Sequence, residues 1–185
     1  MNQARFTFLA AFCALALTAA AQDTNSLRTD LGVLEAQTGD IIIKGFGPVG
    51  SVSAGADVIS VRTKESTDAS SGLKLDGLAI EIESAAQLRE RIYLDYDEID
   101  PLLRAMNYLI KINYDVTPLP GFEASYTTKA GLRFMANSIR KDGVVQHSLQ
   151  YSDAPRIPLS SVQMTQLYDL IEQARKNLDE LKAPK

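Results

Sequence analysis

The spacing of hydrophobic residues changes its period within one stretch, residues 92–110. Over residues 92–96 apolar side chains occupy every second position, which is the period of a strand with one buried face. Over residues 99–110 they recur at intervals of three and four, which is the period of an amphipathic helix. The stretch therefore predicts a strand that runs into a helix, with the junction between Tyr96 and Pro101.

Roughly five strands are expected before this central helix. The first is a short strand over residues 33–37, and a glycine-rich bend is expected at residues 45–50. Asp76-Gly77 predicts a two-residue hairpin turn, because this pair readily adopts the positive φ angles that such a turn needs. Residues 66–72 are polar or small and are expected to form a loop.

Three strands and a helix are expected after the central helix. The first strand covers residues 122–127, and the next two form a hairpin over residues 132–151 that turns at Asp142-Gly143. Pro158 is expected to end the β region. Ser160 then begins a capping-box pattern, and the apolar stripe that follows it predicts a C-terminal helix of about five turns.

This order of elements predicts an α+β fold that is rich in strands. Short turns and alternating strand faces favour an antiparallel, strongly curved sheet or a partly open barrel of about eight strands. The central helix and the C-terminal helix are expected to pack on it. Only one helix separates strands, which disfavours a nucleotide-binding sheet made of alternating strands and helices.

The first 21 residues predict a secretory signal peptide. Arg5 precedes an apolar run that is short for a membrane span, and the run ends in Ala19-Ala20-Ala21. We expect cleavage after Ala21, a flexible leader over residues 22–30 and a single globular domain over residues 31–182. The product is then exported to the periplasm or the cell exterior and has no membrane span. An uncleaved anchor is the alternative.

Composition excludes several classes of function. The chain has 19 basic and 23 acidic side chains, and loss of Arg5 with the signal peptide changes the net charge from −4 to −5. This balance does not attract nucleic acid or an anionic membrane. The only cysteine, Cys13, lies in the expected signal peptide, so the exported chain uses neither disulfides nor thiol chemistry. A single histidine excludes the ordinary structural zinc sites, and no cofactor is expected.

Three motifs match catalytic or binding signatures but lie in the wrong context. Gly45, Gly47 and Gly50 have the spacing of a dinucleotide fingerprint, yet a strand is expected after them where the fingerprint needs a helix. We interpret them as a turn or bulge. Ser138 and Lys141 have the spacing of a serine–lysine catalytic pair, which requires a helix and not the approach to a hairpin turn. His147 has no adjacent carboxylate or nucleophile and is expected to be a hydrogen-bonded structural residue.

Four carboxylates at the start of the central helix form the one cluster with chemical weight: Asp95, Asp97, Glu98 and Asp100. Oxygen-rich clusters suit calcium or magnesium, and paired carboxylates also serve glycoside hydrolysis. Helix starts favour the same residues, which cap free N–H groups and interact with the helix dipole. We expect Asp97 or Asp100 to cap the helix, and we regard the four only as weak metal candidates.

Three functions are compatible with the sequence. The first is a non-catalytic secreted or periplasmic domain that binds an envelope protein, or a small apolar ligand between sheet and helices. The second is a cell-envelope hydrolase that uses the carboxylate cluster, with or without a divalent cation. The third is a structural component of the envelope. A cleft that gathers three or more of the carboxylates would favour the hydrolase.

Overall fold

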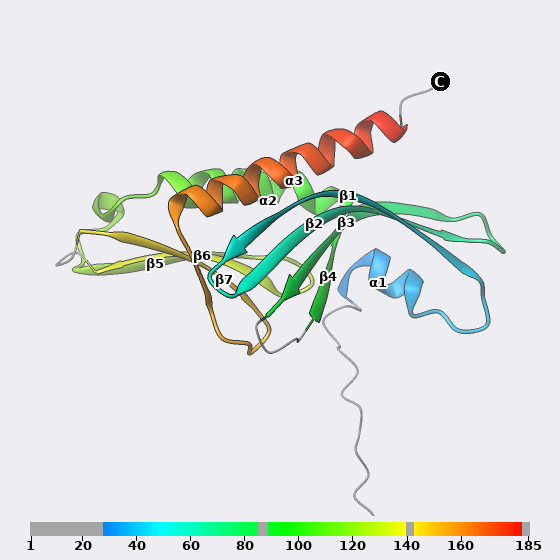
Figure 1. Ribbon diagram of the computed structural model, residues 1–185, viewed down its shortest axis with the longest axis horizontal. Coiled ribbons are helices and arrows are strands. Elements are labelled where there is room, and N and C mark those ends of the chain that lie inside the picture. The colour runs from blue at the N-terminus through cyan, green and yellow to red at the C-terminus, as the bar shows by residue number, and fades with distance from the viewer. Residues whose placement is uncertain (1–27, 85–88, 140–142, 183–185) are drawn as a thin grey trace, which may run out of the picture.

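The computed structural model describes residues 28–84, 89–139 and 143–182 (Figure 1). Its elements are α1 (Asp30–Glu35), β1 (Ile42–Ala54), β2 (Asp57–Asp68), β3 (Lys74–Glu83), β4 (Arg89–Asp95), α2 (Tyr96–Lys111), η2 (Tyr114–Val116), β5 (Gly121–Thr127), β6 (Leu132–Ile139), β7 (Val145–Tyr151), β8 (Ile157–Leu159) and α3 (Ser161–Lys182). After α1 the chain thus runs twice through one order, four strands and then a long helix. The expected signal peptide lies outside the described residues.

The eight strands lie in two antiparallel four-stranded sheets. Sheet A has the order β1-β2-β3-β4 and sheet B has the order β5-β6-β7-β8, so each sheet follows the chain from strand to strand. The α+β class and the antiparallel pairing are confirmed. The expectation of one sheet is wrong, because α2 separates β4 from β5 and the chain starts a second sheet after it. The curved-sheet or open-barrel arrangement is not confirmed.

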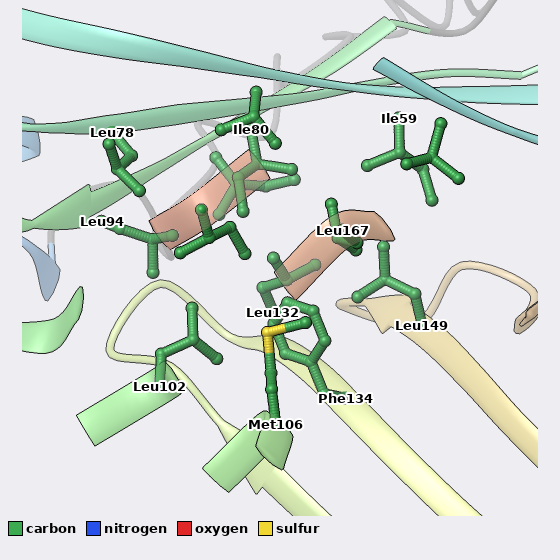
Figure 2. Close-up of a cluster of buried hydrophobic side chains, with 14 of the residues drawn as sticks. Ile59, Leu78, Ile80, Leu94, Leu102, Met106, Leu132, Phe134, Leu149 and Leu167 are labelled. Atoms are coloured by element: carbon green, nitrogen blue, oxygen red, sulfur yellow. The ribbon is translucent and has the colours of Figure 1, made fainter. Parts of the chain in front are cut away.

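The two long helices and the inner faces of both sheets enclose one hydrophobic core. In Figure 1, α2 and α3 lie on one side of sheet A and α1 lies on the other. Figure 2 shows core side chains from all four components: Ile59, Leu78, Ile80 and Leu94 of sheet A, Leu102 and Met106 of α2, Leu132, Phe134 and Leu149 of sheet B, and Leu167 of α3. Because α3 also packs on β1 and β2, and α2 on β5 and β6, the two halves share this core.

The C-terminal helix α3 is confirmed, with the capping box and the buried apolar stripe that the sequence predicts. Ser160 Oγ accepts the N–H of Gln163 at 3.1 Å, and Gln163 Oε1 accepts the N–H of Ser160 at 2.7 Å. The stripe residues Met164, Leu167, Ile171, Ala174 and Leu178 are all at most 1% exposed. Leu181, at the end of the expected stripe, is 69% exposed and lies beyond the core.

Three local predictions in the first half are wrong. The strand expected from residue 33 is instead the end of α1, whose N-cap Thr29 accepts the N–H of Gly32 at 3.0 Å. The glycine-rich bend is part of the 13-residue strand β1, in which the register shifts between Pro48 and Gly50. A bulge, one of the two interpretations of those glycines, is therefore confirmed. Asp76-Gly77 lies inside β3, and the turn falls earlier, where Gly72 has a φ of +73°.

Packing, and not a turn, explains the glycine inside β3. A Cβ on Gly77 would overlap the backbone oxygen of Leu94 and approach Cδ1 of Leu31 to 2.6 Å. Leu31 and Leu34 of α1 are 0% and 2% exposed. The short helix therefore lies directly on the outer face of sheet A, the face turned away from α2 and α3, and covers one end of it (Figure 1).

The short strand β8 was not expected, because Pro158 predicts a break. It pairs with three residues of β7, and Pro158 lies opposite Ser148. Since β8 is the edge of sheet B, a proline that lacks an N–H is tolerated there. The expected hairpin before it is confirmed as β6 and β7, although Asp142 of its turn lies outside the described residues.

Candidate functional site

Asp95 is the first residue of the carboxylate cluster and joins β4 to α2. Its side chain also caps α1. Its carboxylate accepts the N–H groups of Asp30 at 2.9 Å and of Leu31 at 3.1 Å, both in the first turn of α1. Helix α2 begins at Tyr96, with Asp95 as its N-cap residue. The expectation that Asp97 or Asp100 caps α2 is therefore wrong, because the extended backbone of β4 ends earlier than Pro101 indicates.

Lys129, in the turn between β5 and β6, holds three members of this cluster together. Its Nζ lies 3.1 Å from Asp95 Oδ2 and 3.1 Å from Asp97 Oδ1. Glu98 accepts the backbone N–H of Lys129 at 2.7 Å and that of Asp95 at 3.2 Å. Burial alone would lower the pKa of the Lys129 amine, but the hydrogen bonds to the two aspartates outweigh it and raise this pKa above its ordinary value. An ammonium group thus takes the central position of the cluster.

Asp100 is turned away from the other three carboxylates. Its Oδ1 lies 3.2 Å from Nη1 of Arg175 on α3, so it links the two long helices. Within the described residues, no three carboxylate, imidazole or thiol groups are arranged to hold a metal ion. Each carboxylate that the sequence singled out thus has a structural partner.

Two other sequence candidates, His147 and Ser138, each lie within hydrogen-bond distance of a backbone carbonyl. Nε2 of His147 lies 3.0 Å from the carbonyl oxygen of Leu109, and the ring is buried against α2. The hydrogen bond that was expected of His147 is therefore confirmed. Ser138 donates its hydroxyl to the carbonyl of Val144 at 2.9 Å, as a residue of strand β6, while Lys141 lies outside the described residues.

A cluster that the sequence did not single out lies on the outer face of sheet A. We name it the cationic face and define it by Phe46 of β1, Arg62 and Lys64 of β2, and Arg91 and Tyr93 of β4. Between these strands, β3 places only small residues opposite Lys64 and Arg62, namely Gly77 and Ala79. Long side chains from both edges of the sheet can therefore meet above it.

Three cations surround the ring of Phe46. The distances to the ring centre are 4.2 Å from Nζ of Lys64, 5.0 Å from Cζ of Arg62 and 5.2 Å from Cζ of Arg91. Nζ of Lys64 also lies 4.5 Å from the centre of the Tyr93 ring. All four distances are within the roughly 6 Å over which a cation is attracted to an aromatic face.

Two carboxylates balance part of this charge. Glu81 Oε1 lies 2.7 Å from Nε of Arg91 and 3.5 Å from Nη1 of Arg62. Glu35 of α1 pairs with Lys64 and lies 2.8 Å from Nζ of Lys44. The four cations Lys44, Arg62, Lys64 and Arg91 thus face two carboxylates, so these six side chains together carry a net charge of about +2 on a chain whose net charge is −4.

The cationic face has a buried end and an open end. The side chain of Lys64, which α1 covers, is 0% exposed, and that of Glu35, the last residue of α1, is 7% exposed. Burial alone would raise the pKa of Glu35, but hydrogen bonds from Lys44, Lys64 and Ser66 outweigh it and lower this pKa to about 2. Burial lowers the pKa of Lys64, and the carboxylate of Glu35 opposes that shift. A charged anchor therefore fixes this end of the face.

At the open end, Arg62 and Arg91 have side chains that are 33% and 39% exposed. Nε of Arg62 is buried and has no hydrogen-bond partner among the described residues. The open end therefore presents two guanidinium groups whose positions are fixed by Phe46 and Glu81. Such fixed forks suit carboxylates, which they can bind through two parallel hydrogen bonds.

Comparisons of the chain with protein-family models, with curated proteins and with solved structures found no match. No helix in the described part of the chain is both long enough and apolar enough to cross a membrane.

Proposed function

We propose that the protein is an exported, non-catalytic binding domain whose cationic face binds an acidic segment of a protein partner. One observation carries the proposal: three cations converge on Phe46 and leave a net positive surface on an acidic chain. Charge complementarity guides such an encounter and favours acidic partners over others.

The chemistry of binding follows from the open end of the face. Carboxylates of the partner accept hydrogen bonds from the exposed N–H groups of Arg62 and Arg91. The ring of Phe46 offers apolar contact to the hydrocarbon part of the same side chains. Because Glu81 and Phe46 already hold both guanidinium groups, binding loses less side-chain entropy than it would with free arginines.

The hydrolase alternative has less support. Its carboxylates would have to be free to meet a substrate, whereas Lys129 and backbone N–H groups already occupy Asp95, Asp97 and Glu98. A small apolar ligand would have to bind between the sheets and the helices. Closely packed side chains fill that space (Figure 2), so this alternative also has less support. Among the described residues, no observation favours the third function, a structural envelope component.

Titration of isotope-labelled protein with a peptide of nine glutamates tests the proposal. We expect saturable chemical-shift changes at Phe46, Arg62 and Arg91, and weaker binding as salt rises, because exposed charges are screened. The double variant Arg62→Gln/Arg91→Gln should bind at least about tenfold more weakly, since two charge-assisted contacts are lost. The matched control Arg104→Gln removes an exposed arginine on α2 and should bind as the wild type does. Equal binding by all three proteins would contradict the proposal.

A further inference from the structure

A groove of about 710 Å³ opens on sheet B, far along the chain from the cationic face. Residues 144–148 line one side and residues 158–161 line the other, while Asn137 and Arg156 complete the lining. The volume is within the range of about 300 to 1,000 Å³ that is usual for ligand sites.

The groove exists because β8 is shorter than β7. The short strand pairs only with His147, Ser148 and Leu149, and the chain then turns into α3. The first two residues of β7, Val145 and Gln146, therefore have β6 on one side and no β8 residue on the other. Within the described ranges no strand pairs with this side of Val145 and Gln146, so it is a free strand edge that lines the groove.

Polar residues from two strands line the groove. Asn137 of β6 lies opposite Gln146 of β7, and Ser148 follows two positions later on the same face. Ser148 is 6% exposed, and its hydroxyl has no hydrogen-bond partner among the described residues. Leaving a buried hydroxyl unpaired is unfavourable, so this group calls for a hydrogen-bond partner that the described part of the chain does not supply.

Arg156 adds a positive charge to the groove. Its side chain is 46% exposed, and its Nη2 lies 3.3 Å from Oε2 of Glu123. A guanidinium carries five N–H donors, so the ion pair with Glu123 leaves donors for a second carboxylate.

We propose that the groove binds the C-terminal end of a short extended peptide. The terminal carboxylate pairs with Arg156, and the peptide backbone pairs with the free edge of β7 as an added strand. The amides of Asn137 and Gln146 and the hydroxyl of Ser148 bind the peptide's carbonyl and N–H groups. This site does not depend on the cationic face, and either proposal can fail without the other.

A titration of isotope-labelled protein tests the site. The probe is a mixture of tripeptides of randomised sequence, used with free C-terminal carboxylates and again with amidated C-termini. We expect shifts at Val145, Gln146 and Ser148, with at least about tenfold weaker binding of the amidated mixture and of the variant Arg156→Gln, because each removes the charge-assisted contact. Ser148→Ala should weaken binding several-fold while it leaves the remaining spectrum unchanged.

The matched control is Arg133→Gln, which removes an exposed arginine on the same face of sheet B outside the groove. It should bind the free-acid mixture as the wild type does. The proposal is overturned if millimolar free-acid mixture shifts no groove residue, if the amidated mixture binds equally well, or if Arg133→Gln weakens binding as much as Arg156→Gln.

Discussion

The guanidinium carbon of Arg91 lies 5.2 Å from the centre of the Phe46 ring, although the two residues belong to β4 and β1, the opposite edges of sheet A. The contact is possible because β3 places Gly77 and Ala79 beneath it. All four strands therefore contribute to one surface, which the short helix α1 closes at one end through Glu35.

Because of Glu35, the free energy of unfolding should decrease at acid pH. Its pKa of about 2 is below the ordinary value of 4.5, so its contribution is complete above pH 4.5 and is lost as pH falls through about 2. The difference corresponds to on the order of 3 kcal/mol in the free energy of unfolding. Urea unfolding of the wild type and of Glu35→Gln at a series of pH values measures this contribution. The part of the pH dependence that the variant lacks is the contribution of Glu35.

The same variant should also be less stable at neutral pH. Glu35→Gln leaves the buried ammonium of Lys64 without its carboxylate, which typically costs about 3 to 5 kcal/mol. An unchanged pH dependence together with wild-type stability at pH 7 would show that the ion pair has no net effect.

Calcium and magnesium should not stabilise the protein, because the ammonium of Lys129 takes the place of a cation between Asp95 and Asp97. A site filled at 100 times its dissociation constant would add about 2.7 kcal/mol, or roughly 5 to 10 °C in Tm for a domain of this size. Thermal unfolding in millimolar calcium measures this. A saturable rise of that size, abolished by Asp97→Asn, would identify a metal site after all.

Loss of Lys129 should destabilise the fold. Lys129→Met leaves the nearly buried carboxylate of Asp95 without a counter-ion, at a cost of about 1 to 3 kcal/mol, a range that allows for the partial exposure of the lysine. Lys111→Met, at the exposed end of α2, is the control and should change the free energy of unfolding by less than about 0.5 kcal/mol. Equal effects of the two substitutions in urea unfolding would argue against the Lys129 network.

Gly77→Ala should destabilise the protein by about 1 to 3 kcal/mol, because the added methyl overlaps the backbone of β4 and pushes against Leu31. Gly45→Ala is a matched control in the same sheet, where the nearest atom to the new methyl is 3.7 Å away. Chemical unfolding of both variants measures the difference. If both substitutions are neutral, α1 does not lie against Gly77 in solution.

The C-terminal helix should contribute strongly to stability. Leu167→Ala or Ile171→Ala should cost about 2 to 5 kcal/mol, because both side chains are 0% exposed. Leu181→Ala, at a side chain that is 69% exposed, should cost less than about 0.5 kcal/mol. Denaturant midpoints compare the three variants, and a small loss for Leu167→Ala would place the helix outside the core.

The spacing of hydrophobic residues predicted the two long helices. The switch of period near Tyr96 identified α2, and the stripe from Met164 identified α3. Helix α1 was missed because six residues are too few to show a helical period. Gly77 suggested a turn because a glycine in the sequence looks the same whether it serves a turn or a close contact. Only the position of α1 shows that Gly77 serves a close contact.

The sites depended on partners that are distant in the sequence. The carboxylates near Asp95 were recognised as a group, but Lys129, which neutralises them, is 34 residues from Asp95. Alternation along β2 places Arg62 and Lys64 on the same side of the strand. Their contact with Phe46 and the approach of Arg91 depend on strand order, which the hydrophobic pattern does not determine.

Comparative capture of partners from an extract of the native cells and their medium tests the cationic face most directly. Wild-type protein, the Arg62→Gln/Arg91→Gln double variant and the Arg104→Gln control are immobilised in equal amounts, and bound proteins are cross-linked and identified by mass spectrometry. We predict a partner that the wild type and the control recover, that the double variant loses, and whose acidic segment is cross-linked next to Phe46. Recovery of the same proteins by all three, or cross-links confined to other surfaces, would contradict a binding role for the cationic face.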